Sequence, residues 1–306
     1  MANTILEKSA LPPEIQRHRE RSWTEAEAFA FCTRLTKSHY ENFPVGSVLM
    51  PARLQPAVHS LYAFMRTADD FSDENRRAGD EQERLSWLES WDAMLSDCER
   101  GKADHPIFIA LRSTLAQYDL PAQWLHDLVH AFSMDCTVRR YETSDDLLNY
   151  CRYSANPVGR LILTLFGYRD EELYRLSDSI CTALQLANHW QDVAVDLDKD
   201  RIYLPQASWR RFGVMEEDLR ARVATPEFKQ MLAFEMERAR EYFEMGRALP
   251  EKVKGRLRWE LRFTWRGGVR ILDKIEKLDY DVFTKRPVVT KADWLGIALR
   301  TLFSHG

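Results

Sequence analysis

Hydrophobic residues recur at the spacing of an α-helix along almost all of this 306-residue chain, and this period limits the possible folds more than any other feature. From residue 56 onward, Val58, Leu61, Tyr62 and Met65 follow the spacing i, i+3, i+4, i+7, which places them on one helix face. The same spacing is found in segments 81–98, 106–118, 121–134, 173–195, 226–248, 253–277 and 291–303. We therefore predict an all-α protein of about ten helices.

The low content of turn-forming residues supports long helices joined by short connections. Glycine and proline occur 12 times each among 306 residues, whereas an average soluble chain contains about 12% of the two together. A β-sandwich or propeller is disfavoured because it needs a turn about every ten residues. Only residues 201–204 and 287–290 have a β pattern. Asn156-Pro157 predicts a kink or break within the apolar segment 145–166.

Charge, hydropathy and cysteine content exclude several classes of protein. The net charge of −4, from 43 basic and 47 acidic residues, disfavours a nucleic-acid-binding protein. No apolar run reaches the ~18 residues of a membrane span, and residues 1–23 lack the apolar core of a signal peptide. The odd number of scattered cysteines, with no C-x-x-C pair, predicts a reduced, cytoplasmic protein. These are Cys32, Cys98, Cys136, Cys151 and Cys181.

The chain has no low-complexity linker, so we predict a single domain. Residues 1–30 would form an N-terminal extension with the first helix, and residues 31–285 the main helical body. Residues 286–306 would add a C-terminal helix packed on the same domain. This length exceeds that of a simple four-helix bundle.

Four acids within six residues mark the end of the apolar helix predicted from residue 56. Asp69 and Asp73 are four residues apart and share one helix face, and Asp70 and Glu74 form a second such pair. These carboxylates repel one another unless a cation or a basic side chain, such as Arg66, is near. A solvated helix end is the alternative interpretation.

A second oxygen-rich cluster follows one face of the segment 173–195 and its continuation. Asn188, Asp192 and Asp196 have the spacing i, i+4, i+8 and are separated by mostly apolar residues. Acids on such an apolar helix are costly unless a metal ion or a basic group satisfies them. A solvated face is therefore a weaker interpretation here than for the first cluster.

Two carboxylate clusters on helices suit hard cations, above all Mg²⁺, which binds carboxylates, water and phosphate oxygens. If the two faces point across a helical cavity, several ions can hold a diphosphate and allow an allylic C–O bond to ionise. The resulting carbocation needs a dry, apolar pocket. The 9 Trp, 15 Phe and 11 Tyr residues could line such a pocket, because aromatic faces stabilise cations.

Three segments, residues 61–73, 184–196 and 201–205, resemble the squalene/phytoene synthase family in sequence and in order. The resemblance extends from about His39 to Gly268. It implies the all-α class I isoprenoid synthase fold with a central cavity, and assigns residues 31–285 to a head-to-head prenyl synthase domain. Within the family, segments 38–46, 150–160 and 188–196 are most similar to hydroxysqualene synthases of the bacterial hopanoid route.

The resemblance also implies roles for individual residues. Mg²⁺ would be bound by Asp69 and Asp73 on one wall, and by Asn188, Asp192 and Asp196 on the other. The residues that match substrate-binding, mainly diphosphate-binding, positions are His39, Arg66, Asn188, Arg201 and Tyr203. It implies catalytic roles for Asp69, Asp73, Tyr150, Asp192 and Asp196, and a catalytic role is also expected for Asn156, which departs from the family pattern. Among these, Tyr150 matches a cavity tyrosine that handles carbocations or shuttles protons.

Two departures from the family pattern are informative. Gln191 stands where many members have arginine, so one cation near the diphosphate is missing. Ser154 and Asn156 stand where many members have a run of small, apolar residues. We predict that these polar groups hold a water molecule that captures a rearranged carbocation.

The expected activity is that of a hydroxysqualene synthase, which ionises presqualene diphosphate, derived from farnesyl diphosphate, and adds water after rearrangement. The alternative within the family is condensation of two prenyl diphosphates to presqualene diphosphate, squalene or phytoene. A non-catalytic helical assembly factor is a different-class alternative, but such a relative would be expected to have lost acids from one or both clusters. Peripheral contact with the inner membrane surface and association with neighbouring pathway enzymes stay open.

Three further signals have other interpretations. His126 and His130 lie one helical turn apart, as in zinc sites, but no third ligand is evident and packing or capping is favoured. Arginine at every fourth position of segment 258–270 predicts a basic helix face for salt bridges, diphosphate attraction or anionic lipid. The amphipathic segment 294–303 predicts core packing, with membrane contact as the alternative.

Overall fold

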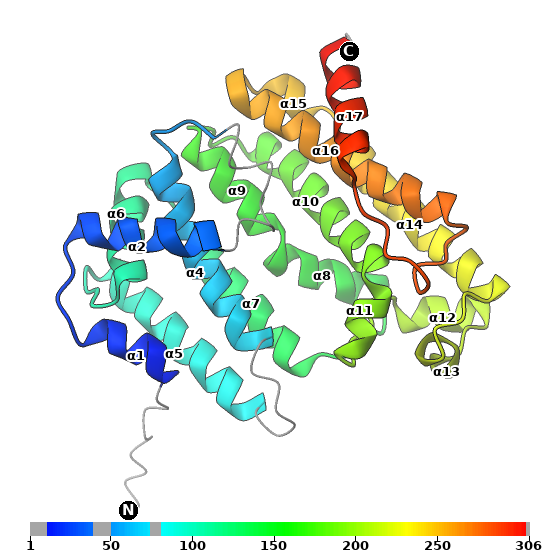
Figure 1. Ribbon diagram of the computed structural model, residues 1–306, viewed down its shortest axis with the longest axis horizontal. Coiled ribbons are helices and arrows are strands. Elements are labelled where there is room, and N and C mark those ends of the chain that lie inside the picture. Colours follow the sequence, from blue (N-terminus) through cyan, green and yellow to red (C-terminus); the bar gives the residue numbers. More distant parts are fainter. Residues whose placement is uncertain (1–10, 39–49, 74–80, 304–306) are drawn as a thin grey trace, which may run out of the picture. The chain divides into compact units, whose positions relative to one another are not determined.

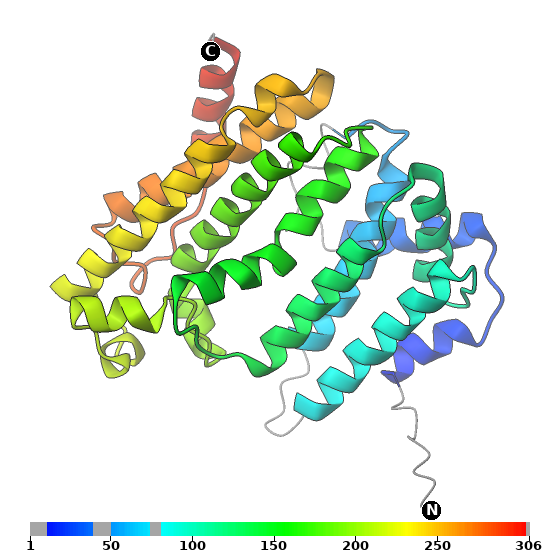
Figure 2. The same cartoon turned by 180° about the vertical axis from the view of Figure 1, so that it is seen from behind.

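The computed structural model describes residues 11–38, 50–73 and 81–303 (Figures 1 and 2). Every regular element in these ranges is a helix, and an isolated bridge pairs Arg140 with Ile202. The all-α prediction is confirmed: of the two short segments with a β pattern, 201–204 contributes only the bridge residue Ile202, and 287–290 forms no strand. The described ranges contain sixteen helices rather than about ten, since five of them have only four to seven residues and are too short to show a period.

The helices belong to two compact units, residues 1–137 and 138–306. The first contains α1 (Pro13–Arg19), α2 (Glu25–Ser38), α4 (Gln55–Asp73), α5 (Glu81–Glu99), α6 (Pro106–Tyr118) and α7 (Gln123–Thr137). The second contains α8 (Ser144–Ser154), α9 (Asn156–Leu165), α10 (Glu171–Gln191), α11 (Val193–Asp198), α12 (Gln206–Phe212), α13 (Glu216–Arg220), α14 (Pro226–Gly246), α15 (Leu249–Lys252), α16 (Gly255–Lys277) and α17 (Lys291–Phe303). This division does not fall at the expected boundaries after residues 30 and 285, and the single domain stays a prediction.

In the first unit, α4 packs against α2, α5, α6 and α7. Its core is aromatic: the Phe64 ring stacks on Trp91 at 5.7 Å, and Phe108 meets Trp91 edge-on at 4.6 Å. All three side chains are fully buried. Aromatic pairs of this kind add specific geometry to the burial of large apolar surfaces, so they fix α4 against α5 and α6.

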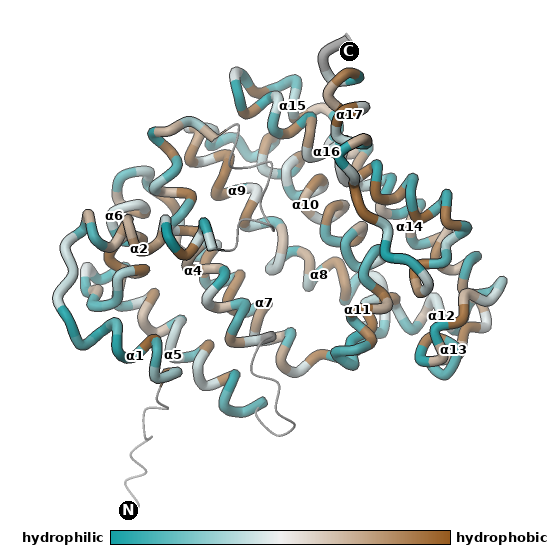
Figure 3. The backbone as a smooth tube through the Cα atoms, viewed as in Figure 1, coloured by the Kyte–Doolittle hydropathy of each residue, from teal (hydrophilic) through white to brown (hydrophobic). Residues whose placement is uncertain are grey.

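In the second unit, α10 is the central helix and packs against α8, α9, α14, α15 and α16. Glycines allow α9 and α14 to approach α10 closely. A Cβ on Gly159 of α9 would lie 2.3 Å from Ser177 Oγ, and one on Gly246 of α14 would lie 2.8 Å from the Leu176 carbonyl oxygen. Along α14, hydrophobic and hydrophilic residues alternate as the helical period predicts (Figure 3).

Two helix breaks position functional side chains. α8 ends at Ser154 and α9 begins at Asn156, with Ala155 at φ −121° between them, so the predicted break is confirmed. α10 and α11 are separated only by Asp192. There the backbone hydrogen bonds continue, from Asp192 N–H to Asn188 O at 2.9 Å and from Asp196 N–H to Asp192 O at 2.8 Å. The interruption therefore preserves the helical spacing of these three residues.

No helix in the described part of the chain combines the length and the apolar character that a bilayer span requires.

Candidate functional site

The acidic end of α4 is neutralised from within the same helix. Arg66 Nη1 lies 3.1 Å from Asp69 Oδ2, and Arg66 Nη2 lies 2.5 Å from Asp70 Oδ1. The buried face of α4 holds this turn in place, because Phe64 and Ala68 are fully enclosed in the core. One guanidinium thus bridges two carboxylates three and four residues farther along, a spacing that any helix provides. The side chain of Asp73 and residue His39 lie outside the described residues.

A second arginine, Arg84, supports the same helix end and was not predicted from the sequence. Its Nη1 donates a hydrogen bond to the Ser72 carbonyl at 3.0 Å, and its side chain is buried. A positive charge at the C-terminal end of a helix is favourable because the carbonyl oxygens there carry partial negative charge. No feature of the α5 sequence distinguishes Arg84 from the exposed charges beside it.

The second acidic cluster is neutralised from far away in the sequence. Asp192 has only 13% of its side chain exposed. Arg286 binds both of its carboxylate oxygens, with Nη2 at 3.0 Å from Oδ2 and Nε on Oδ1. Arg286 belongs to the segment between α16 and α17, 94 positions beyond Asp192. The hydrogen bonds of this ion pair raise the pKa of Arg286, so the guanidinium stays charged.

The segment that carries Arg286 is also fixed to the end of α10. The buried Gln191 side chain donates from Nε2 to the Pro287 carbonyl at 2.5 Å. Gln191 therefore does not replace the family's arginine chemically; it anchors the segment that brings Arg286 to the neighbouring carboxylate. Sequence reasoning identified the missing cation at position 191 but not the residue that provides one, because no local pattern links positions 94 residues apart.

Four aromatic rings form a cluster beside Asp196. His189 stacks on Tyr203 with ring centroids 3.6 Å apart and planes at 15°, and the Tyr141 and Tyr150 rings lie within 6.0 Å of this pair. Burial, and then the charge of Arg201, lower the pKa of His189 to about 3, so its ring is neutral near pH 7. Neither ring nitrogen of His189 has a hydrogen-bond partner within the described ranges.

A small cavity of about 10 Å³, enough for roughly one water molecule, lies against this ring cluster. Its lining consists of His189, Val193, Asp196, Arg201, Ile202, Tyr203 and Leu204. The Arg201 backbone N–H also donates to the Asp196 carbonyl at 2.9 Å. The structure thus brings the predicted residues Asp196, Arg201 and Tyr203 together around one small cavity.

The junction of α8 and α9 presents the polar residues predicted to hold water. Tyr150 and Ser154 are four residues apart on α8 and therefore share a face. The Ser154 hydroxyl oxygen is buried and has no hydrogen-bond partner among the residues described. Asn156 Oδ1 accepts a hydrogen bond from Thr182 of α10 at 3.0 Å. This contact fixes the Asn156 amide against the helix that carries Asn188 and Asp192.

The side chains within each unit do not by themselves complete the coordination of a metal ion in the described part of the chain. In the residues that the structure describes, no three His, Cys, Asp or Glu side chains gather as a metal site. Asn188 is exposed, one turn before Asp192. A metal ion at this cluster would therefore complete its coordination with the Asn188 amide oxygen, water or substrate oxygens.

The histidine pair has a different role from the zinc site considered above. His126 Nδ1 lies 2.5 Å from Asp92 and Nε2 lies 3.1 Å from Glu99, so both ring nitrogens meet carboxylates of α5. Burial alone would lower the pKa of His126, but these two hydrogen bonds and charges outweigh it and raise the pKa. His126 thus ties α7 to α5, while His130 is exposed.

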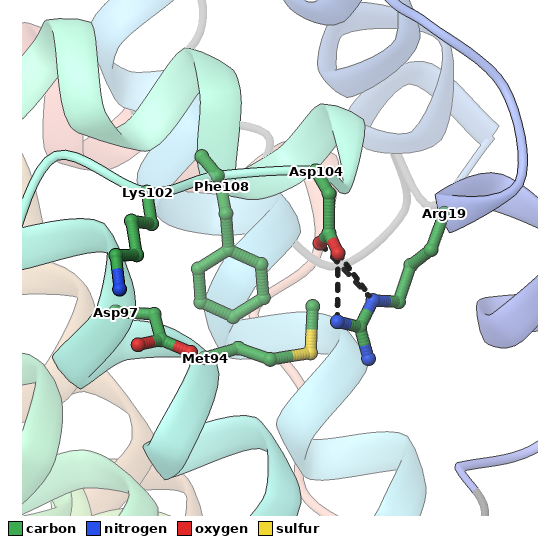
Figure 4. A pocket seen from close by; sticks show the side chains of 7 residues that line it. Arg19, Met94, Asp97, Lys102, Asp104 and Phe108 are labelled. Carbon is green, nitrogen blue, oxygen red and sulfur yellow. Dashed lines mark hydrogen bonds and ion pairs between the residues drawn. The ribbon is translucent and has the colours of Figure 1, made fainter.

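An open pocket of about 350 Å³ lies in the first unit, where α5 is followed by α6 (Figure 4). Met94 and Phe108 form its apolar part. An ion pair between Arg19 and Asp104, with Nη2 at 2.7 Å from Oδ2, lies on one side of the pocket. Asp97 of this pocket is 13 residues beyond Arg84 on the same helix, a distance of about 20 Å. The pocket is therefore separate from the acidic end of α4.

An all-α chain with oxygen-rich clusters on two of its helices has the features of the isoprenoid synthases, enzymes that act on prenyl diphosphates. A model of the squalene/phytoene synthase family matches residues 36–293, so the chain belongs to this family. The predicted resemblance is confirmed, and family members act on prenyl diphosphate substrates.

Individual relatives include different activities. The chain is 36% identical over 223 residues to a hydroxysqualene synthase of Rhodopseudomonas palustris, covering 72% of this chain and 74% of that protein. It is 30% identical over 276 residues to the 15-cis-phytoene synthase of Synechococcus elongatus, covering 86% and 89%. The crystal structure of squalene synthase HpnC from Alicyclobacillus acidocaldarius superimposes with a TM-score of 0.79 at 42% identity, covering 84% and 95%. This similarity confirms the isoprenoid synthase fold.

Proposed function

We propose that this protein is a hydroxysqualene synthase, which converts presqualene diphosphate and water to hydroxysqualene and diphosphate. The observation that carries the proposal is the polar junction of α8 and α9, where the buried Ser154 hydroxyl lacks a protein partner and Asn156 is fixed by Thr182. Identity of 36% to a hydroxysqualene synthase supports the same activity. A synthase that ends its reaction without water has no need of polar groups there.

The chain's residues fit Mg²⁺ as the cofactor. Arg286 places a positive group on both oxygens of the largely buried Asp192 carboxylate, and a hard divalent cation prefers the same oxygens. The residues that would hold Mg²⁺ are Asp69, Asp73, Asn188, Asp192 and Asp196. When bound, Mg²⁺ neutralises the leaving diphosphate and favours ionisation of the C–O bond. That both clusters share one diphosphate across a central cavity stays a prediction.

The other residues bind and orient the substrate. Arg66 and Arg201 carry permanent positive charge and would hold diphosphate oxygens through N–H donors. The stacked rings of Tyr203 and His189, with Tyr150 beside them, offer apolar and π-rich surface that stabilises a carbocation and excludes bulk water. Because His189 is neutral, it does not repel that positive charge.

The overall reaction consumes one water molecule, and the polar junction of α8 and α9 would hold it. The bond between carbon and the diphosphate oxygen breaks, and its electron pair leaves with the diphosphate. After rearrangement, the oxygen of one water molecule bonds to the cationic carbon, and the released proton passes to the diphosphate. Ser154 and Asn156 would hold that water by hydrogen bonds.

The direct test uses the purified full-length chain with Mg²⁺ and presqualene diphosphate in water enriched in ¹⁸O. We expect hydroxysqualene carrying one ¹⁸O atom, because the hydroxyl oxygen comes from solvent. An unlabelled alcohol, or a hydrocarbon product alone, would overturn the proposal.

Two variants test the polar junction itself. Ser154→Ala and Asn156→Val should lower the ratio of alcohol to hydrocarbon products, since the capturing water loses its hydrogen bonds. Ser179→Ala is the matched control: its hydroxyl donates to the Arg175 carbonyl within α10, and its product ratio should equal that of the wild type. Unchanged ratios in both junction variants would contradict the assignment.

A second candidate is squalene or phytoene synthase activity, which the identities to the HpnC squalene synthase and to the 15-cis-phytoene synthase support. Incubations with farnesyl diphosphate, with and without NADPH, and with geranylgeranyl diphosphate distinguish these activities by the extracted product. No turnover of these three mixtures or of presqualene diphosphate would favour a non-catalytic assembly factor instead.

A further inference from the structure

The imidazole ring of His189 is buried, and its nitrogens have no protein partner. Only 3% of the residue is exposed, and neither Nδ1 nor Nε2 forms a hydrogen bond with any residue that the structure describes. A buried polar group without a partner costs free energy, and native proteins satisfy nearly all such groups with protein atoms or ordered water. The proposed function uses only the face of this ring, so its nitrogens have no assigned role.

Neighbouring rings hold His189 in this position. Its ring lies on Tyr203 with centroids 3.6 Å apart, and the Tyr150 ring lies 6.0 Å away. His189 also belongs to the last turn of α10, where the Asp192 N–H donates to the Asn188 carbonyl and continues the helical hydrogen bonds. The ring is therefore held inside its unit, and its nitrogens can reach only what lies beside it.

The cavity of about 10 Å³ beside this ring has polar as well as apolar walls. Its polar lining consists of His189, Asp196, Arg201 and Tyr203. Asp196 Oδ2 and Arg201 Nε are both buried atoms. A cavity holds a water molecule when it has room for about one probe sphere and offers two to four polar partners. This cavity meets both conditions.

The polar groups of the lining are complementary to one water molecule. The Arg201 guanidinium can donate to the water oxygen, and the Asp196 carboxylate can accept one of the water hydrogens. A neutral imidazole has one donor and one acceptor nitrogen, so His189 can supply a third hydrogen bond in either direction. The cavity is too small for a phosphate group, so water is the ligand that fits.

We propose that this cavity binds one water molecule, and that His189 is a positioning residue that acts through this water on the Asp196 carboxylate. Groups that hydrogen-bond to a metal-binding carboxylate fix its orientation and raise its affinity for the ion. The inference rests on the proposed function in one respect, because Asp196 is there a ligand of Mg²⁺. The Asp196 carbonyl already accepts from the Arg201 N–H, so the water would fix the side chain of a residue whose backbone is held.

Packing alone is the competing explanation for His189. The ring would then serve only its stack on Tyr203, and phenylalanine would replace it without loss. Burial of an imidazole is costlier than burial of a phenyl ring when its nitrogens make no hydrogen bonds. The two explanations predict opposite outcomes when stacking and hydrogen bonding are separated.

Two variants separate stacking from hydrogen bonding. His189→Phe keeps the stack but cannot bind water, so the Kd of Mn²⁺, used as a probe for Mg²⁺, should rise about tenfold. Its midpoint of denaturant unfolding should stay at or above that of the wild type. His189→Gln loses the stack but keeps an amide that can bind the water, so its Kd should stay within about twofold of the wild type while its unfolding midpoint falls. Electron paramagnetic resonance of free Mn²⁺ gives each Kd.

The matched control is His105→Phe. His105 is also fully buried with an unpartnered Nε2 in the described ranges, but it belongs to the first unit, and its Nδ1 accepts from the Ile107 N–H at the start of α6. This variant should unfold more easily and bind Mn²⁺ like the wild type. A wild-type Mn²⁺ affinity in His189→Phe, or an equal loss in His189→Gln or in the control, would overturn the proposal.

A crystal structure of the full chain, at a resolution that shows ordered water, tests the site directly. We expect one water molecule within hydrogen-bond distance of a His189 nitrogen and of the Asp196 and Arg201 side chains, and none there in His189→Phe. A dry cavity in the wild type would overturn the proposal. Neither measurement involves turnover, so their failure leaves the proposed activity intact. A wild-type enzyme that makes only hydrocarbon would refute the proposed activity and leave this water site standing.

Discussion

The two acidic clusters of this protein are neutralised in opposite ways. Arg66 bridges Asp69 and Asp70 from one turn away on the same helix, whereas Arg286 reaches Asp192 from 94 residues away. The first arrangement forms wherever α4 is helical. The second requires that α10, α16 and the segment after α16 are all in place.

The difference extends to solvent exposure. Asp69 has 36% of its side chain exposed, but Asp192 has only 13%. A carboxylate withdrawn from water depends more strongly on a positive partner. Two clusters that look alike in sequence should therefore respond differently when their arginines, their packing or the pH are changed.

The largest effect should appear when one carboxylate is neutralised in each cluster. Asp69→Asn and Asp192→Asn should each reduce turnover of the prenyl diphosphate on the order of a thousandfold, because each loses several kcal/mol of charge stabilisation. Steady-state kinetics on folded protein would measure this loss. Asp198→Asn, an exposed carboxylate paired with Arg222, is the control. Full turnover by either cluster variant would show that only one cluster serves the reaction.

The second-largest effect should follow from a change in the packing around α10, because this helix positions the second acidic cluster. Gly246→Ala places a Cβ 2.4 Å from Ile180 and 2.8 Å from a carbonyl oxygen, so we expect a loss of about 2 kcal/mol in the free energy of unfolding. Gly296→Ala on α17 has nothing within 4 Å and should stabilise by up to about 1 kcal/mol. Denaturant unfolding measures both. A neutral Gly246→Ala would mean that α14 can move away from α10 without cost.

Removing each arginine tests the two modes of neutralisation directly. Arg286→Met should tighten binding of Mn²⁺, used as a probe for Mg²⁺, about tenfold, equivalent to about 1.4 kcal/mol, because both Asp192 oxygens become free. Arg66→Met should have a smaller effect, since its acids are more exposed. Electron paramagnetic resonance of free Mn²⁺ gives the affinities without substrate.

The exposed neighbour Lys285 provides the control for this experiment. Lys285→Met should leave the Mn²⁺ affinity unchanged. Equal affinities in Arg286→Met and in the wild type would show that the guanidinium and the metal ion do not compete for Asp192.

The smallest expected effect is the pH dependence of stability that His126 gives to the first unit. Because contacts with Glu99 and Asp92 raise the pKa of folded His126 above its unfolded value, its stabilisation is present below about pH 6.5 and is lost as the pH rises through the folded pKa. His126→Gln should therefore cost up to about 1 kcal/mol at pH 5.5 and little at pH 8.5. The exposed His130→Gln serves as control in the same unfolding series. A loss independent of pH would assign His126 to packing alone.

The sequence alone determined those helices whose hydrophobic residues repeat at helical spacing and whose ends are marked by nearby residues such as proline. The predicted segments 106–118 and 291–303 coincide with α6 and α17, and the break at Asn156-Pro157 was predicted from proline chemistry. Both acidic motifs were also identified, because the helical spacing that unites their residues acts over one or two turns.

Only the tertiary structure decided which groups satisfy those motifs. Arg84 on the Ser72 carbonyl, Arg286 on Asp192 and the stack of His189 on Tyr203 join different helices or loops. Periodicity and helix-stop rules act over a few neighbouring residues, so they fix where a side chain lies on its own helix. Which side chain it meets depends on the packing of whole helices, and that is set by the summed burial of many distant residues rather than by any local pattern.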